Sequence, residues 1–66
     1  MHDTPSNLKR LLSYWLEHNG EHRVEFCDWA DRIAAEQADI ALQLRQAADK
    51  MAEADEYLKK ARDLLK

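Results

Sequence analysis

The feature that most constrains the fold is the spacing of apolar residues in the second half of the chain. Between residues 40 and 65, apolar side chains recur at alternating intervals of four and three residues. They are Ile40, Leu44, Ala47, Met51, Ala54, Leu58, Ala61 and Leu65. This heptad pattern is typical of an α-helix that packs along one side against other helices. The sequence therefore predicts a helix over about residues 40–65.

The first half of the chain predicts another amphipathic helix, over about residues 5–35. It opens well at Thr4-Pro5, because threonine caps helices and proline is favoured in the first turn. Apolar residues then recur at helical spacing: Leu8, Leu11, Leu12, Trp15 and Leu16, and later Phe26, Trp29, Ala30 and Ile33. The two sets stay in phase only if the helix continues through Gly20. A break at Asn19-Gly20 is the main alternative, since Asn-Gly also ends helices.

A turn near residues 35–39 is expected to fold the two helices into an antiparallel hairpin, with Asp39 as the cap of the second helix. An unbroken helix of about 60 residues would be about 90 Å long, with only a narrow seam to hold it. A hairpin this small has little interior, and the single cysteine, Cys27, cannot form an intrachain disulfide. The predicted fold class is all-α: one domain, residues 1–66, whose two-helix hairpin self-associates into a helical bundle.

Composition and charge argue against several classes of function. Thirteen acidic and ten basic residues give a net charge of −3, and the basic residues are spread along the chain. Nucleic acid and membrane surfaces are therefore not expected as partners, since both need a concentrated positive face. No stretch approaches the roughly 18 apolar residues of a membrane span, and no signal peptide is evident. We expect a soluble, cytoplasmic protein whose partner is itself, as a homodimer or higher oligomer.

The stretch Trp15-Leu-Glu-His18-Asn-Gly-Glu-His22 places two histidines four residues apart beside the only glycine. At about 100° per residue, His22 lies about 40° from His18 on the helix, and Glu25 lies about 20° to the other side. All three fall in the middle of the stripe that elsewhere carries Leu, Trp, Phe and Ile. Polar side chains that face a bundle core must be hydrogen-bonded, paired or bound to a metal ion.

Two histidines at this spacing can bind one ion, so His18 and His22 are the predicted metal ligands, with Glu25 as a third ligand or as a partner that orients a histidine. If the chain turns near residue 37, residues whose numbers sum to about 74 face each other. This register brings Met51 and Asp55 towards the histidines as second-tier ligands. The expected cofactor is a transition metal ion (Zn, Ni, Co, Cu or Fe), and the ligands do not decide which.

Storage, buffering or delivery of the metal suits so short a chain better than catalysis, since no phosphate-binding loop or nucleophile motif is present. The alternative function is a structural oligomerisation or protein-interaction module, in which the histidine pair forms a buried polar layer without metal. Cys27 lies about 180° from His18 on the helix and is expected to face solvent or another subunit. His2, in the amino-terminal tail, is expected to be inert.

The stretch from Leu12 to His22, followed by Phe26 and Trp29, resembles a group of small, uncharacterised prokaryotic helical proteins with an L-x-x-W-x-x-H-N-x-E-H pattern. In that pattern another residue often stands in place of Gly20, which supports a continuous helix. More loosely, the layout is similar to ferritin-like assemblies of two-helix hairpins with Glu and His ligands. The chain departs from their Glu-x-x-His motif, because it carries the reversed order, His22-x-x-Glu25.

Overall fold

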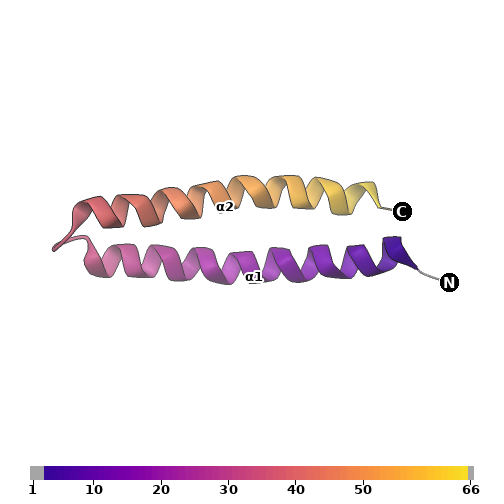
Figure 1. The fold of residues 1–66 in the computed structure, drawn as a ribbon, viewed down its shortest axis with the longest axis horizontal. Coiled ribbons are helices and arrows are strands. Elements are labelled where there is room, and N and C mark those ends of the chain that lie inside the picture. The colour runs from indigo at the N-terminus through magenta and orange to yellow at the C-terminus, as the bar shows by residue number, and fades with distance from the viewer. Residues whose placement is uncertain (1–2, 66) are drawn as a thin grey trace.

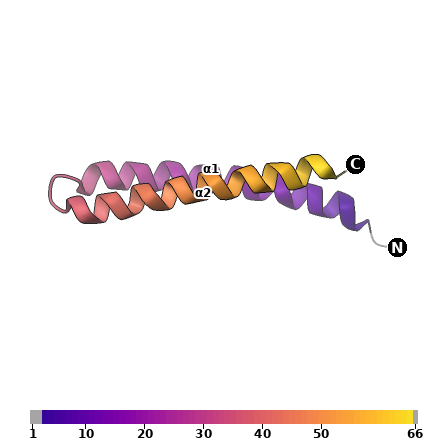
Figure 2. The same ribbon diagram turned by 90° about the horizontal axis from the view of Figure 1, so that it is seen from above.

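The structure, a computed structural model, describes residues 3–65 as an antiparallel hairpin of two long helices (Figure 1). Helix α1 spans Thr4–Ile33 and helix α2 spans Ala38–Leu64, joined by a turn over residues 34–37. The helices cross at a shallow angle when seen from above (Figure 2). The all-α fold and the hairpin predicted from the sequence are confirmed. His2 lies outside the described residues.

Helix α1 is continuous through Gly20. The backbone at Gly20 does not have a positive φ, and a Cβ added there would meet only the Arg23 side chain, at 4.0 Å. The helical conformation is therefore not one that demands glycine. The apolar periodicity on both sides of Gly20, and not the tendency of Asn-Gly to end helices, decides the local structure.

The ends of the helices differ slightly from those expected. Asp3 caps α1, since its Oδ1 accepts a hydrogen bond from the Ser6 backbone N–H at 3.4 Å. The residue at the cap position of α2 is Gln37, and the expectation that Asp39 caps this helix is wrong. Asp39 lies instead in the first turn of α2, where a carboxylate is favourable next to the positive end of the helix dipole.

The seam between the two helices is narrow. Its buried apolar residues, among those that the structure describes, are Leu12 and Ala30 on α1 and Ala41 and Ala48 on α2. On α2, Ala41 directly follows Ile40 of the heptad stripe, and Ala48 directly follows Ala47. The seam therefore runs along one edge of the stripe and not along its centre. The stripe itself is only partly covered: Leu44, Met51 and Leu58 are half-buried, whereas Ile40, Ala47, Ala54 and Ala61 are exposed.

Polar side chains set the register of the seam. The contacts are Asn19 with Asp55 at 2.9 Å, Arg23 with Asp55 at 3.6 Å, and Asp31 with Arg45 at 2.7 Å. Residues whose numbers sum to about 76 therefore lie level across the seam, close to the register expected from the sequence.

Much of the bulky apolar surface remains exposed on the hairpin. The large exposed apolar residues are Leu8, Leu11, Tyr14, Trp15, Val24, Trp29, Ile40, Leu42, Tyr57 and Leu64. Neither α1 nor α2, over the described range 3–65, combines the length and apolar character needed to cross a bilayer.

Candidate functional site

His18 and His22 lie one turn apart near the middle of α1, and their rings meet. The two Nε2 atoms face each other at 3.1 Å, and the ring centroids are 4.5 Å apart in an edge-on arrangement. The side chains remain 49% and 42% exposed, so solvent reaches the pair on the isolated hairpin. Two imidazole nitrogens at this distance need either a proton or a metal ion between them, since two lone pairs would repel.

The distance between the Nε2 atoms suits chelation of a single ion. Imidazole nitrogens bind zinc at about 2.0–2.1 Å, so two of them at a tetrahedral angle lie about 3.3 Å apart, and at a right angle about 2.9 Å apart. The observed 3.1 Å lies between these values. The pair therefore meets the distance requirement for binding one ion.

A carboxylate lies behind each ring. The Nδ1 atom of His18 is 3.6 Å from Oε1 of Glu21, and the Nδ1 atom of His22 is 3.4 Å from Oε1 of Glu25. Histidines that bind metals commonly donate their other N–H to a carboxylate, which fixes the tautomer and makes the ligand more basic. Glu25 thus lies where it can orient His22, and not beside the two facing nitrogens.

Glu21 occupies the same position towards His18, although it is not among the metal ligands predicted from the sequence. Its signal was available, because His18-x-x-Glu21 repeats the spacing of His22-x-x-Glu25. Three residues correspond to nearly one helical turn, so each glutamate reaches the ring that precedes it.

Two aromatic side chains extend the stack of rings. Tyr14 stacks on His18 at 5.4 Å between centroids, and Phe26 stacks on His22 at 6.1 Å. The four rings follow one another at intervals of four residues along α1. These contacts restrict the rotation of both imidazoles, which lowers the entropy lost when they bind a ligand.

Asp55, a second-tier candidate, is held elsewhere. It is buried in the seam, with 3% of its surface exposed. Its Oδ1 accepts a hydrogen bond from Nδ2 of Asn19, and its Oδ2 lies 3.6 Å from Nε of Arg23, which has no hydrogen-bond partner and is itself buried. These three residues form the polar layer of the seam. The layer lies on a different side of α1 from the histidine pair.

The remaining candidates differ in burial. Met51 is half-buried on α2, and Cys27 is an exposed free thiol. Within residues 3–65, no three His, Cys, Asp or Glu side chains come close enough together to hold one ion. A single chain therefore offers two imidazole ligands, and a four-coordinate ion would need further ligands from another source.

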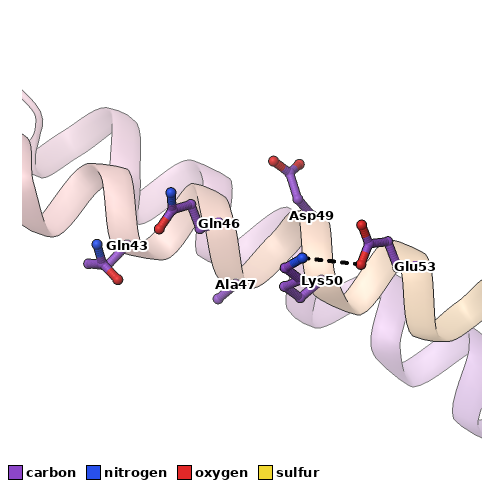
Figure 3. Close-up of a pocket in the computed structure, with 6 residues that line it drawn as sticks. All are labelled: Gln43, Gln46, Ala47, Asp49, Lys50 and Glu53. Atoms are coloured by element: carbon purple, nitrogen blue, oxygen red, sulfur yellow. Dashed lines mark hydrogen bonds and ion pairs between the residues drawn. The ribbon is translucent and has the colours of Figure 1, made fainter.

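An open depression on α2 contains none of the candidate ligands. Six residues of this one helix line it: Gln43, Gln46, Ala47, Asp49, Lys50 and Glu53 (Figure 3). The ion pair between Lys50 and Glu53, at 3.4 Å, spans part of the surface. Since no group from α1 converges on it, the depression is a feature of the outer surface of the helix.

Comparison with known proteins assigns the chain to a family. The chain belongs to the family described as domain of unknown function DUF8180, whose profile matches residues 8–65 and so includes the histidine pair and nearly all of both helices. An uncharacterised protein of Archaeoglobus fulgidus is 43% identical over 58 residues, which are 88% of this chain and 94% of that protein. No solved structure matches the chain.

Proposed function

We propose that this chain forms a homo-oligomeric helical bundle that binds a transition metal ion through His18 and His22. The observation that carries the proposal is the 3.1 Å approach of the two Nε2 atoms. The carboxylates of Glu21 and Glu25 support it, because each lies within ion-pair distance of the outer nitrogen of one ring. A proton held on each Nδ1 leaves the lone pair of each Nε2 for the ion.

Self-association is supported by what the hairpin leaves uncovered. Within residues 3–65, its buried apolar core comprises one leucine and three alanines, whereas Trp15 and Trp29 are 40% and 57% exposed. A chain of this size needs more buried apolar surface than one narrow seam supplies. An oligomer buries the exposed stripe and brings further ligands to the ion.

Storage, buffering or delivery of a metal in the cytoplasm fits the site better than catalysis. Imidazole ligands suit Zn, Ni, Co, Cu or Fe, and no nucleophile motif accompanies them in the sequence.

A second candidate function is a protein-interaction module without metal. The observation that favours it is the same 3.1 Å distance, which is also that of a hydrogen bond from one imidazole to the other. In that case the histidines form a polar layer within an interface.

Elemental analysis of the untagged protein separates the two functions. The protein is loaded with Zn, Co, Ni or Cu, dialysed, and compared with His18→Ala/His22→Ala and with His2→Ala as a matched control. Metal binding predicts a stoichiometric ion in the wild type and the control, and none in the double variant while its circular dichroism stays helical. A metal-free wild type, or a double variant that keeps its ion, would contradict the proposal.

A further inference from the structure

One face of the hairpin carries the uncovered stripes of both helices. On α1, the stripe through His18 and His22 lies about 100° from the seam residues Leu12 and Ala30, towards lower angles on the helical wheel. On α2, the exposed part of the heptad stripe lies on the same rotational side of its seam. Because the two helices run in opposite directions, a rotation of the same sense about each helix axis, starting from the seam, leads to the same face of the hairpin. The two stripes therefore form one surface, with exposed tryptophans on one helix and exposed alanines on the other.

The stripe on α1 is self-complementary about residue 20. Its central residues are Leu11, Trp15, His18, His22, Glu25 and Trp29. They form three pairs that are symmetric about residue 20: Leu11 with Trp29, Trp15 with Glu25, and His18 with His22. When a second copy of α1 packs antiparallel about this point, His18 of each copy faces His22 of the other. Leu11 then faces Trp29, and Trp15 faces Glu25, whose carboxylate can accept a hydrogen bond from the indole N–H.

The stripe on α2 fits the same axis. The register of the seam places residue 20 level with about residue 56. Antiparallel pairing of two α2 helices about that level gives three layers, which are Ala47 with Leu65, Met51 with Ala61, and Ala54 with Leu58. Each layer sets one small residue against one large residue, which lets the two helices interdigitate without voids.

We propose that a second copy of this chain completes the metal site. Two hairpins pack face to face about a two-fold axis at the level of residue 20, and His18 and His22 of both copies bind one shared ion. Four imidazoles satisfy the tetrahedral preference of zinc, which the two of one chain do not. This inference rests on the proposed function and deepens it, since it names the source of the missing ligands.

The size and charge of the face suit such a dimer. The Cα atoms extend over 55 × 15 × 12 Å, so a second copy that packs on the broad face can contact the hairpin along its whole length. An isologous interface repeats every contact twice. The shared ion also adds positive charge between four glutamates, two from each copy, at Glu21 and Glu25.

Cysteine cross-linking tests the axis independently of the metal. In a Cys27→Ser background, Met51→Cys/Ala61→Cys is compared with Ala61→Cys alone. The two-fold axis brings position 51 of one copy opposite position 61 of the other, so the double variant should form a covalent dimer. Positions 61 of the two copies are offset by about 15 Å along the helices, too far for a disulfide. The single variant should therefore remain uncross-linked.

Native mass spectrometry of the zinc-loaded wild type supplies the second measurement. One ion for two chains is expected, together with cross-linking of the double variant only. An ion for each chain, or cross-linking of Ala61→Cys alone, would overturn the shared site while leaving metal binding intact. No bound zinc at any concentration would overturn the proposed function and the shared ion together, and the cross-links would then report on the dimer alone.

Discussion

Replacement of Asp55 by alanine tests the account of what holds the two helices in register. Asp55 is almost fully buried and accepts a hydrogen bond from Asn19 at 2.9 Å, while Arg23 lies 3.6 Å away. A hydrogen bond to a charged group contributes about 1.5–3 kcal/mol, and its loss leaves the Asn19 amide without an acceptor in the seam. The Arg23 Nε is buried but makes no hydrogen bond to Asp55, and the Arg23 side chain is 40% exposed overall, so we count its ion pair as a small addition. The expected loss is about 2 kcal/mol, or about 10 °C in Tm for a chain of this size.

Thermal and urea unfolding, followed by circular dichroism at one fixed protein concentration, measure this loss. Asp49→Ala is the matched control, because Asp49 is an exposed aspartate on the same helix. Asp55→Asn keeps the acceptor for Asn19 but removes the charge, and should cost less than Asp55→Ala. If Asp55→Ala costs no more than Asp49→Ala, within about 0.5 kcal/mol, the polar layer does not stabilise the seam and the reasoning is refuted.

Three further outcomes are expected. Glu25→Gln should weaken zinc binding about 10- to 100-fold, because the carboxylate no longer orients the imidazole; competition with a chromophoric chelator measures this, and an equal loss in Glu17→Gln would contradict it. Gly20→Ala should raise the free energy of unfolding by about 0.5–1 kcal/mol in urea titrations, since the position is helical and open; destabilisation would show that the backbone there needs glycine. Trp29→Ala should raise the dimer dissociation constant at least about 10-fold in sedimentation equilibrium, whereas Tyr57→Ala, at another exposed aromatic residue, on α2, should leave it unchanged; equal effects would place the interface elsewhere.

The two helices and the hairpin followed from local patterns in the sequence. The apolar spacing on both sides of Gly20 stays in phase, and that periodicity correctly indicated one continuous α1. The turn was harder to place, because residues 34–39 contain no glycine or proline and Asp39 is an equally good residue for a cap or a first turn. The backbone hydrogen bonds of the first turn, and not the side chain of Asp39, define where α2 begins.

The polar layer of the seam could not be predicted with the same ease. Whether Asp55 faces α1 or solvent depends on a rotation of α2 by about one residue, or 100°, and the heptad pattern alone does not fix that rotation. The seam uses the edge of the stripe that contains Ala41, Ala48 and Asp55. The long-range pairing of Asn19 with Asp55 is a consequence of this choice, and only the packed hairpin reveals it.

For the histidines, the sequence indicated the spacing but not the orientation of the rings. An interval of four residues brings His18 and His22 together on any helix. That their Nε2 atoms face each other depends on the rotamers, which in turn depend on Tyr14 and Phe26 above and below and on the glutamates behind each ring. The pair is half-exposed on the hairpin and is therefore accessible to the second copy that we propose.

X-ray absorption spectroscopy of the zinc-loaded protein tests the central claim most directly, because it reports the atoms bound to the ion. The account predicts a shell of nitrogen ligands at about 2.0–2.1 Å with the scattering pattern of imidazole, and its loss in His18→Ala/His22→Ala. A sulfur ligand at about 2.3 Å would point to Cys27. That result, or a shell of oxygen atoms without imidazole, would contradict the assignment of His18 and His22 as the metal ligands.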